Sequence, residues 1–457
     1  MTFSMPIILS LGFLSVYSYF FYPVVLIAAR RAGVGRRMRT RLVPGAPSLQ
    51  SAVLSSYAEP AIAVPSVASV TSYAGTEPFR PGADWAAGGV AEHVPEHAAR
   101  VTSEEPFVPD RDPNRKPSPD YAPRLSLIIT AHNEEERIRA KLDNAMGIDY
   151  PQGQLEIIVA SDACTDGTEA IASSYRGVRV VRVKERKGKE HAQKMAIMAS
   201  SGEILVFSDV ATMLDREALI LLARNFRDPS VGALSSTDKM IGEDGSPSGE
   251  GLYVRYEMLL RRLESDVRGL VGLSGSFFAA RRAVCMLWAE DLPSDFNTVL
   301  NCARLGYRAV SDDAVIGYYK DIKHGQSEFQ RKVRTLVRGI TALFANLELL
   351  DARRFGFFSF QLFSHKLMRW LAPLFMILLL AASLAAAAKG DRFGILMLAA
   401  QGTYYGSALL GHLIPLSRGN PIVKVTFFHA QANMAILAAW IKYLRGERIR
   451  MWTPSKR

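Results

Sequence analysis

Two aspartates in the middle of the chain follow apolar runs and could hold a nucleotide or a metal ion. Asp162 lies just after Leu155–Ala160, and Asp209 just after Glu203–Ser208. A carboxylate at the end of a buried strand costs free energy unless it binds something. Asp209 suits Mg²⁺ or Mn²⁺, because these hard ions take one or two carboxylates together with phosphate oxygens. The alternative is that Asp209 caps a helix.

A third aspartate, Asp295, could act as a general base. It lies in the segment Leu292–Asn297, ahead of a predicted helix over Thr298–Leu305. In a transfer reaction, a carboxylate here would take the proton of an acceptor hydroxyl. The residues alone slightly favour the other interpretation, in which Asp295 is the N-cap of that helix.

Polar residues suited to nucleotide binding stand after the first expected strand and before a later helix. His132, Asn133 and Glu134 could read a nucleobase or a ribose, or Asn133 could simply cap a helix. Lys187 and Lys189 suit a diphosphate, aided by the backbone N–H groups of a helix start. On their own, the two lysines are more typical of a solvated basic turn.

A glycine-rich turn follows a charged helix further along the chain. The helix carries Glu257 and Arg261 four residues apart, which is ordinary on a helix surface. The turn, Val271–Ser276, contains Ser274 and Gly275. Glycines there indicate a close backbone approach to a ligand or to a neighbouring element.

The elements that position these residues have the pattern of a soluble α/β domain from Arg124 to about Val315. Apolar runs of strand length alternate with helical patterns, which predicts a mostly parallel sheet. The polar clusters fall at the carboxyl ends of strands, where ligands bind in open α/β sheets. The expected strands are Leu125–Thr130, Leu155–Ala160, Val178–Val183 and Glu203–Ser208, and the expected helices are Glu134–Met146, Asp166–Ser174 and Lys189–Ser200.

Composition narrows the possible partners. The 457 residues are 49% hydrophobic and carry a net charge of +11, which fits nucleic acid, anionic lipid or an anionic substrate. The chain has no recognisable nucleic-acid motif, and arginines cluster beside apolar runs, at residues 30–41 and 445–450. That placement indicates anchoring among membrane lipids and no nucleic-acid partner. The three cysteines match no zinc or disulfide framework, which indicates a reducing compartment.

The amino-terminal part of the chain divides into an apolar run and a linker. Met5–Ala29 is long enough to cross a ~30 Å hydrocarbon core. Arg30 and Arg31 follow it at once, which predicts a retained anchor with its basic end in the cytoplasm. Residues 36–122 are rich in Ala, Pro and Ser and predict a disordered linker.

The carboxyl-terminal part is expected to lie on and in the membrane. Phe329–Phe363 is basic and amphipathic, which is typical of a membrane interface. Three apolar stretches follow, Leu367–Ala388, Phe393–Leu416 and Val423–Leu444, and polar residues make the third the weakest candidate. If all three crossed, the basic tail would lie outside, against the usual charge bias. We therefore expect that one stretch does not cross, or that one is split in two.

In order and spacing, the polar clusters resemble the inverting glycosyltransferases of family 2, which have a GT-A fold. Within that family the chain resembles the membrane branch that includes cellulose and hyaluronan synthases and bacterial exopolysaccharide glycosyltransferases. The resemblance covers about Leu125–Arg338. It implies that Asp209 belongs to the metal-binding Asp-x-Asp motif, with Mg²⁺ or Mn²⁺ as cofactor, and that Asp295 is the catalytic base.

The resemblance also assigns the binding residues around these two carboxylates. The nucleotide-sugar group is His132, Asn133, Glu134, Asp162, Lys189 and Arg334, and the acceptor-side group is Ser274 and Gly275. Three positions depart from the family pattern. Ala211 replaces the second Asp of Asp-x-Asp, Ser294 stands before the catalytic Asp, and Thr335 follows Arg334 where processive synthases carry the Trp of Gln-x-x-Arg-Trp. The last departure leaves transfer of one sugar as open as polymerisation.

The sequence therefore predicts a membrane-bound, inverting hexosyltransferase at the cytoplasmic face of the inner membrane. Its donor would be a nucleotide-sugar, with a UDP-sugar favoured, and its acceptor a polysaccharide or lipid-linked glycan; other polysaccharide-assembly proteins could be partners. The alternative is a degenerate nucleotide-binding scaffold. The expected domains are an anchor over 1–35, a linker over 36–122, a GT-A domain over 123–325, interface helices over 326–365 and a membrane region over 366–457.

Overall fold

The computed structural model describes residues 4–34, 121–241, 252–320 and 325–449, all of which belong to one compact unit. The linker expected over residues 36–122 lies outside the described residues, apart from its last two positions. All three cysteines lie among the described residues, and none of them is in a disulfide.

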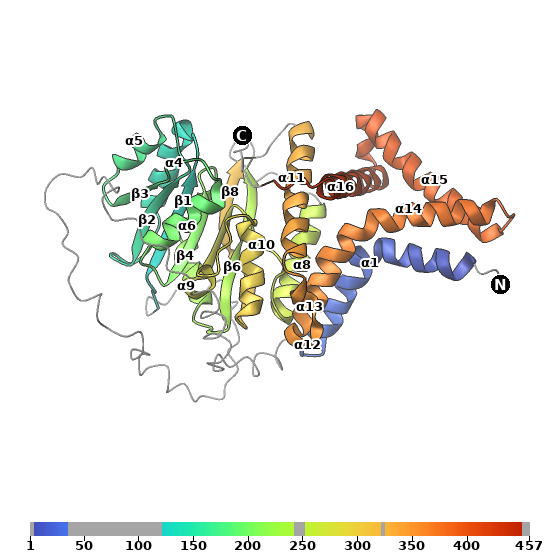
Figure 1. The fold of residues 1–457 in the computed structure, drawn as a ribbon, viewed down its shortest axis with the longest axis horizontal. Helices are drawn as coiled ribbons and strands as arrows, with labels where there is room; N and C mark the ends of the chain where they lie inside the picture. The colour runs from blue at the N-terminus through green and yellow to red at the C-terminus, as the bar shows by residue number, and fades with distance from the viewer. Residues whose placement is uncertain (1–3, 35–120, 242–251, 321–324, 450–457) are drawn as a thin grey trace. The chain divides into compact units, whose positions relative to one another are not determined.

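A single eight-stranded sheet forms the centre of the α/β part, in the order β3-β2-β1-β4-β7-β6-β8-β5 (Figure 1). The first four neighbours pair in parallel, β7 joins them antiparallel to β4, and β6 and β8 pair in parallel. The expectation of a mostly parallel α/β sheet is confirmed. The strands are β1 (Leu125–Ala131), β2 (Leu155–Ser161), β3 (Val178–Arg182), β4 (Ile204–Asp209), β5 (Met213–Leu214), β6 (Val231–Ile241), β7 (Phe277–Arg281) and β8 (Arg308–Lys320).

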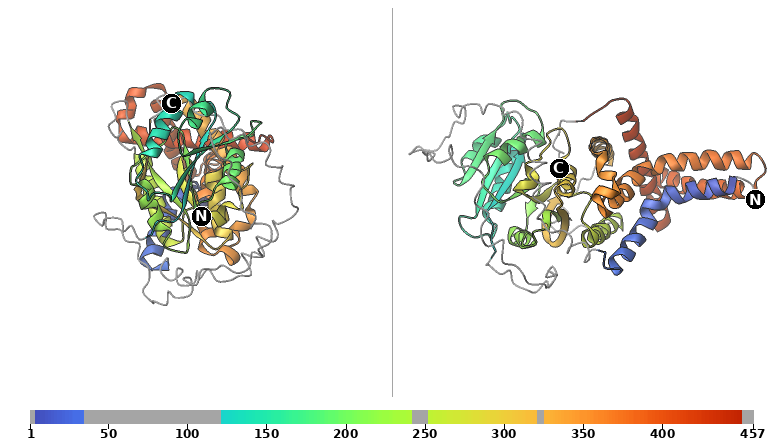
Figure 2. Two further views of the ribbon diagram at one scale, coloured as in Figure 1. Left: turned by 90° about the vertical axis from the view of Figure 1, so that its left-hand side faces the viewer. Right: turned by 60° about the horizontal axis from the view of Figure 1, so that its bottom comes forward.

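Helices cover both faces of the sheet (Figures 1 and 2). On one face, α4 (Glu135–Met146), α5 (Thr168–Ser173) and α7 (Ala218–Asn225) bury apolar residues against the strands. On the other face the core is built with α6 (Lys189–Ala199), α9 (Arg282–Cys285) and α10 (Ser294–Arg304). The seven elements expected between Leu125 and Ser208 are all present, with ends shifted by two residues or fewer, because their apolar runs are continuous and their breaks carry Gly, Asp or Ser.

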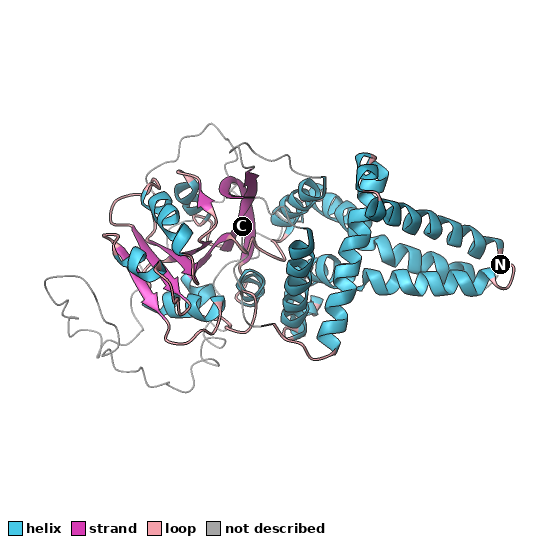
Figure 3. Cartoon of the chain, turned by 90° about the horizontal axis from the view of Figure 1, so that it is seen from above, coloured by secondary structure: helices cyan, strands magenta, loops and turns pink. Residues whose placement is uncertain are grey.

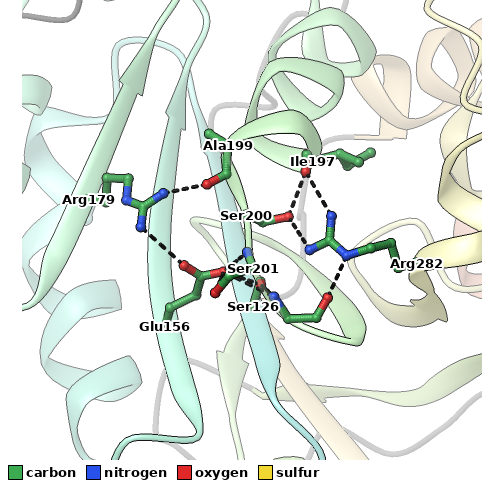
Figure 4. Close-up of polar contacts among 9 residues, drawn as sticks. Ser126, Glu156, Arg179, Ile197, Ala199, Ser200, Ser201 and Arg282 are labelled. Atoms are coloured by element: carbon green, nitrogen blue, oxygen red, sulfur yellow. Dashed lines mark hydrogen bonds and ion pairs between the residues drawn. The ribbon is translucent and has the colours of Figure 1, made fainter. Parts of the chain in front are cut away.

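A dense polar cluster closes the amino end of the sheet (Figure 4). Glu156 of β2 accepts hydrogen bonds from the Ser126 hydroxyl and from the backbone of Ser201 and Gly202, the last two at 2.5 and 3.3 Å. Arg282 donates to the Gly202 carbonyl at 2.8 Å and to the Ser200 hydroxyl at 3.0 Å. These bonds tie the turn between α6 and β4 to the starts of β1 and β2 through Glu156 and Ser126, and to the start of α9 through Arg282.

Three helices are long and apolar enough to cross a membrane: Met5–Arg31, Phe357–Ala387 and Pro421–Leu444. They correspond to α1 (Ser4–Arg31), to α13 (Phe357–Leu362), η5 (Phe363–Leu367) and α14 (Met368–Ala387) in one run, and to α16 (Pro421–Leu444). The run from Arg392 to Leu413 is also helical, as α15, but is not among the candidates.

The polar side chains that lower the hydropathy of α15 bond to its neighbours. Gln401 donates to the Ser383 hydroxyl of α14 at 3.0 Å. On the other side, Tyr404 lies 2.6 Å from His429 of α16. These hydrogen bonds join polar groups of neighbouring helices, so the groups are not left unpaired against lipid. The sequence had made Val423–Leu444 the weakest of the three carboxyl-terminal candidates for a membrane span. That prediction was wrong, because Val423–Leu444 lies in a candidate span and Phe393–Leu416 does not.

The membrane helices and the α/β part meet along α8 (Leu252–Val267). In α1, Tyr22 donates to Glu264 of α8 at 2.5 Å. From η5, His365 lies 2.6 Å from the same carboxylate, and Arg369 of α14 pairs with Glu257 at 2.7 Å. The Glu257–Arg261 segment is thus not a free surface but a partly buried contact with the membrane helices. Burial alone would raise the pKa of Glu257, but Arg369 and His365 outweigh it and hold that pKa well below its usual range.

Candidate functional site

The carboxyl ends of β1, β2 and β4 coincide because the strands run parallel and in register. Ala131 of β1 pairs with Ser161 of β2, and Thr130 pairs with Asp209 of β4. The residues that follow each strand are therefore brought to one edge of the sheet, as the sequence pattern predicted.

Asp162 anchors the turn that precedes α6. Its Oδ1 accepts backbone hydrogen bonds from Lys187 and Gly188, both at 3.1 Å. Its Oδ2 is buried with no hydrogen-bond partner among the described residues, and Arg186 Nε lies 4.0 Å away. A buried carboxylate oxygen without a donor is costly unless a ligand supplies one. This oxygen is therefore a ready acceptor for a ligand N–H or O–H.

The loop after β1 is held in an unusual backbone conformation next to Asp162. Asn133 has φ 52° and Ala163 has φ 51°, a left-handed region that costs non-glycine residues free energy. His132 Nδ1 lies 2.7 Å from the Asp162 carbonyl oxygen. Asn133 bonds to Thr165 and does not cap α4, whose N-cap position is Glu134. Strain of this kind persists where a site needs a particular loop shape.

Glu134 and Lys141 support this edge from α4. Glu134 pairs with Arg137 at 3.1 Å, and burial raises the pKa of its carboxyl although Arg137 opposes the shift. Lys141 is fully buried and donates to the Ser208 hydroxyl at 2.8 Å and to the Thr212 carbonyl at 2.5 Å. Burial lowers the pKa of Lys141 to about 7, with Asp209 opposing the shift. Lys141 thus bonds on both sides of Asp209, to the side chain of Ser208 and to the backbone of Thr212.

Lys189 links Asp209 to the glycine-rich turn. Its ammonium lies 2.5 Å from Asp209 Oδ1 and 2.9 Å from the Gly275 carbonyl oxygen, and it is 6% exposed. Asp209 is the last residue of β4 and lies well before α7, so it caps no helix. Lys189 is therefore a buried cation at this edge and not a solvated side chain, whereas Lys187 in the same turn is largely exposed.

Asp295 lies on the opposite side of the same turn. A methyl group added to Gly275 would come within 3.2 Å of Asp295 Oδ2. The capping interpretation was wrong: α10 begins at Ser294, its N-cap is Pro293, and Asp295 sits in the first turn with no cap hydrogen bond. The prediction of a loop before a helix at Thr298 placed the helix start too late, because Pro293 permits a start directly after it.

Asp238, which lies on β6 beside the turn, was not among the site residues predicted from the sequence. Its carboxylate accepts a hydrogen bond from Ser276 at 2.9 Å and a second from Ser274 at 2.5 Å. Burial raises the pKa of Asp238, although these hydroxyls and Arg261 oppose the shift. Ser274 also donates its backbone N–H to Ser235 at 2.8 Å. These bonds fix the shape of the turn between Lys189 and Asp295. An acidic residue inside an otherwise buried strand was the available signal.

Arg334 is less closely connected to the rest of the site than the other residues predicted for it. It lies on α11 (Gly325–Phe344), is half-buried, and makes no hydrogen bond or ion pair with any described residue. Gln330 and Arg334 are four positions apart, one more than the family motif requires. One turn later on α11, Arg338 pairs with Glu190, the neighbour of Lys189. Arg338 is thus the α11 cation that the structure ties to the site.

The described part of the chain offers few protein ligands for a divalent metal ion. Among the described residues there is no group of three or more His, Cys, Asp or Glu side chains that could hold one. Asp209 is 21% exposed and shares its Oδ1 with Lys189. A Mg²⁺ or Mn²⁺ ion fits here only with Asp209 as a single protein ligand and phosphate oxygens completing the set.

This sheet, with its polar residues gathered at the carboxyl edge, defines a GT-A-like α/β fold. Residues 126–286 match the model described as "Glycosyl transferase family 2". The chain thus carries a glycosyltransferase family 2 domain, as its motifs implied.

Several known proteins are similar to this chain over part of its length. The chain is 24% identical over 191 residues to a poly-beta-1,6-N-acetyl-D-glucosamine synthase of Staphylococcus aureus, which covers 39% of this chain and 46% of the relative. It is 25% identical over 184 residues to a beta-monoglucosyldiacylglycerol synthase of Nostoc sp., at 38% and 39% coverage. The chain spans less than half the length of these relatives. Among solved structures, the mannosyltransferase PcManGT from Pyrobaculum calidifontis, in complex with GDP-Man and Mn²⁺, matches at TM-score 0.57 and 26% identity, over 73% of this chain and 90% of that one.

Proposed function

We propose that this chain is a membrane-bound inverting glycosyltransferase that moves a sugar from a nucleotide-sugar donor to a polysaccharide or lipid-linked acceptor. One observation carries the proposal. The backbone of Gly275 stands between the Lys189–Asp209 pair, which suits a donor diphosphate, and Asp295, which suits an acceptor hydroxyl. The family 2 match and the synthases among the similar proteins support it.

In the proposed reaction the chain's own residues bind, orient and move one proton. Asp162 Oδ2 accepts a hydrogen bond from the nucleobase, and Lys189 places positive charge beside the diphosphate. Arg334 adds charge from α11 when the donor is bound. Asp295 takes the proton of the acceptor hydroxyl, whose oxygen attacks the anomeric carbon from the side opposite the leaving nucleoside diphosphate. That geometry inverts the anomeric configuration.

A divalent ion, held by Asp209 and the donor's phosphates, would neutralise the departing diphosphate. The Mn²⁺ named with the similar mannosyltransferase supports a divalent ion for this chain. That protein is named with GDP-Man, so the nucleotide is an open part of the proposal, with UDP- and GDP-sugars both to be tested.

The membrane arrangement follows from the three candidate helices. If all three helices cross the membrane, the segment before Met5 and the segment after Leu444 lie on opposite sides of that membrane. We place the α/β part and the basic tail at the cytoplasmic face, because Arg30, Arg31 and Arg445 flank the helices on that side. Under this arrangement α15 does not cross as an independent span, which removes the conflict between the helix count and the basic tail.

The test is nucleotide release by the full chain in lipid nanodiscs. UDP-glucose, UDP-galactose, UDP-GlcNAc, UDP-glucuronate and GDP-mannose are supplied in turn with Mg²⁺ or Mn²⁺, beside Asp209→Ala and Asp295→Asn. Release from one donor, lost in both variants, is expected. Release that survives in both variants would contradict the proposed site.

A catalytically degenerate scaffold is the second candidate, favoured by Ala211 and by the Lys189–Asp209 ion pair. It predicts donor binding by calorimetry without release from any donor, even when membrane extracts supply acceptors. Release from any donor that Asp295→Asn abolishes would exclude it.

A further inference from the structure

The loop between α9 and α10 joins the two sides of the proposed site. It comprises residues 286–293, so it ends two positions before Asp295, the proposed base. Glu290 lies in this loop and reaches across to α6, the helix that begins with Lys189. The loop is therefore the covalent lead into the base, and it also contacts the helix that carries the donor-side cation.

Glu290 contacts two side chains of α6. Its Oε2 lies 2.6 Å from His191 Nδ1, and its Oε1 lies 2.7 Å from Lys194 Nζ. His191 and Lys194 are three positions apart, which puts them on one face of the helix. Burial alone would raise the pKa of Glu290, but hydrogen bonds with Lys194 and His191 outweigh it and hold that pKa below its usual value. We call these three side chains the Glu290 clamp.

Trp288 makes a second connection between this loop and the donor side. Its indole N–H donates to the Glu190 carbonyl of α6 at 3.0 Å. Its ring stacks on Phe207 of β4, with ring centres 4.7 Å apart and an angle of 25° between the planes. Phe207 stands two positions before Asp209, and Glu190 directly follows Lys189. The loop therefore rests on both elements that supply the donor-side charges.

The two connections differ in what they contribute. Trp288 is buried, so its packing stabilises the fold. The side chains of Glu290 and Lys194 are 38% and 41% exposed, and ion pairs this exposed add little stability because water screens them. What the Glu290 clamp adds is direction, because two contacts from one carboxylate fix how the loop, and with it the first turn of α10, sits relative to α6.

We propose that Glu290 is a positioning residue for the transfer reaction. By holding the loop on α6, it keeps the Asp295 carboxylate at a fixed place relative to Lys189, and so keeps the acceptor hydroxyl in line with the donor diphosphate. The inference rests on the proposed function, in which Lys189 binds the donor and Asp295 takes the proton. A displacement of about 1 Å between reacting groups costs roughly 10²-fold in rate, so even a small shift of the loop lowers turnover.

The test compares nucleotide release by the full chain in lipid nanodiscs between wild type and Glu290→Ala, which removes both contacts of the clamp. We expect kcat to fall about tenfold, with the KM for the donor and the melting temperature near wild type, because the donor contacts and the core are untouched. The double variant His191→Ala/Lys194→Ala should lose the same factor. The triple variant should lose no more than that, since all three variants remove one and the same clamp.

Asp291→Ala is the matched control, because Asp291 is the exposed acidic neighbour of Glu290 in the same loop. It should keep the wild-type kcat. An unchanged kcat in Glu290→Ala would overturn the proposal, as would an equal loss in Asp291→Ala or losses that multiply in the triple variant. A kcat that falls only together with donor binding and melting temperature would show a structural role instead, and would overturn it too.

Hydrogen exchange checks how Glu290 acts. Backbone N–H groups of residues 286–297 should exchange faster in Glu290→Ala than in wild type or Asp291→Ala. A reduced kcat with equal exchange would mean that Glu290 does not hold the loop, and would overturn the proposal. A wild type that releases no nucleotide from any donor refutes the proposed function, and the positioning role with it, whereas release that is unchanged in Glu290→Ala refutes only the role of Glu290.

Discussion

The two ends of the central sheet both carry polar groups but use them differently. At the amino end, Glu156 and Arg282 bond to protein groups that pull loops together (Figure 4). At the carboxyl end, Asp162 Oδ2 is buried without a hydrogen-bond partner among the described residues, and Asn133 is held at positive φ. Paired groups lower the free energy of the fold, whereas unpaired or strained ones are retained where a ligand completes them.

The sharpest test of this contrast is Asp295→Asn at the carboxyl end. We expect nucleotide release to fall by roughly 10²-fold or more, because the amide cannot take the hydroxyl proton. Donor affinity and melting temperature should stay near wild type. Asp291→Asn is the matched control, since Asp291 is exposed four residues earlier. A variant that turns over normally would remove Asp295 from the base role.

The opposite result is expected from Glu156→Gln at the amino end. The neutral amide oxygen is a weaker acceptor for Ser201 and Gly202, so the free energy of unfolding should drop by about 1–3 kcal/mol. Thermal unfolding measures the loss, and donor calorimetry should show unchanged affinity. Glu136→Gln, an exposed glutamate on α4, serves as control. Weakened donor binding in Glu156→Gln would mean that the two ends are not independent.

At the carboxyl end of the sheet, Asp162→Asn should weaken donor binding while leaving the stability of the fold nearly unchanged. The amide oxygen can still accept from the backbone of Lys187 and Gly188, but the second position becomes a donor. Donor affinity should therefore fall by about tenfold with a small change in melting temperature. Titration calorimetry with the preferred donor measures this. Unchanged affinity would show that Asp162 Oδ2 does not face the nucleotide.

The smallest expected effect is a pH dependence at the amino end. Burial alone would raise the pKa of Glu156, but hydrogen bonds from Ser126 and Ser201 outweigh it and leave the pKa below its ordinary value of 4.5. A carboxyl with a lowered folded-state pKa contributes stability that is fully present above its unfolded pKa and is lost as pH falls through the folded one. The difference in melting temperature between wild type and Glu156→Gln should hold at pH 7 and shrink below about pH 4.5. A difference independent of pH would contradict a charged Glu156.

Much of the α/β part could be predicted because the sequence patterns that specify its strands and helices are local. Continuous apolar runs identified β1, β2 and β4, and the polar residues after each run lie at one edge because parallel strands end together. The long strands β6 and β8 were not anticipated: polar residues interrupt both, and only pairing along the sheet stabilises them. The start of α10 was predicted too late, because the helix begins directly after Pro293, its N-cap.

The sequence by itself determined the family, the parallel sheet and the aspartates that lie at its edge, since these depend on residue type and short-range period. Only the tertiary structure decided which groups face one another. It paired Lys189 with Asp209, set Asp238 under the glycine-rich turn and brought Lys366 to the same turn from a helix more than 90 positions along the chain. Such contacts join residues far apart in sequence, so no local pattern encodes them; they follow from packing α8, α10 and the membrane helices against one sheet.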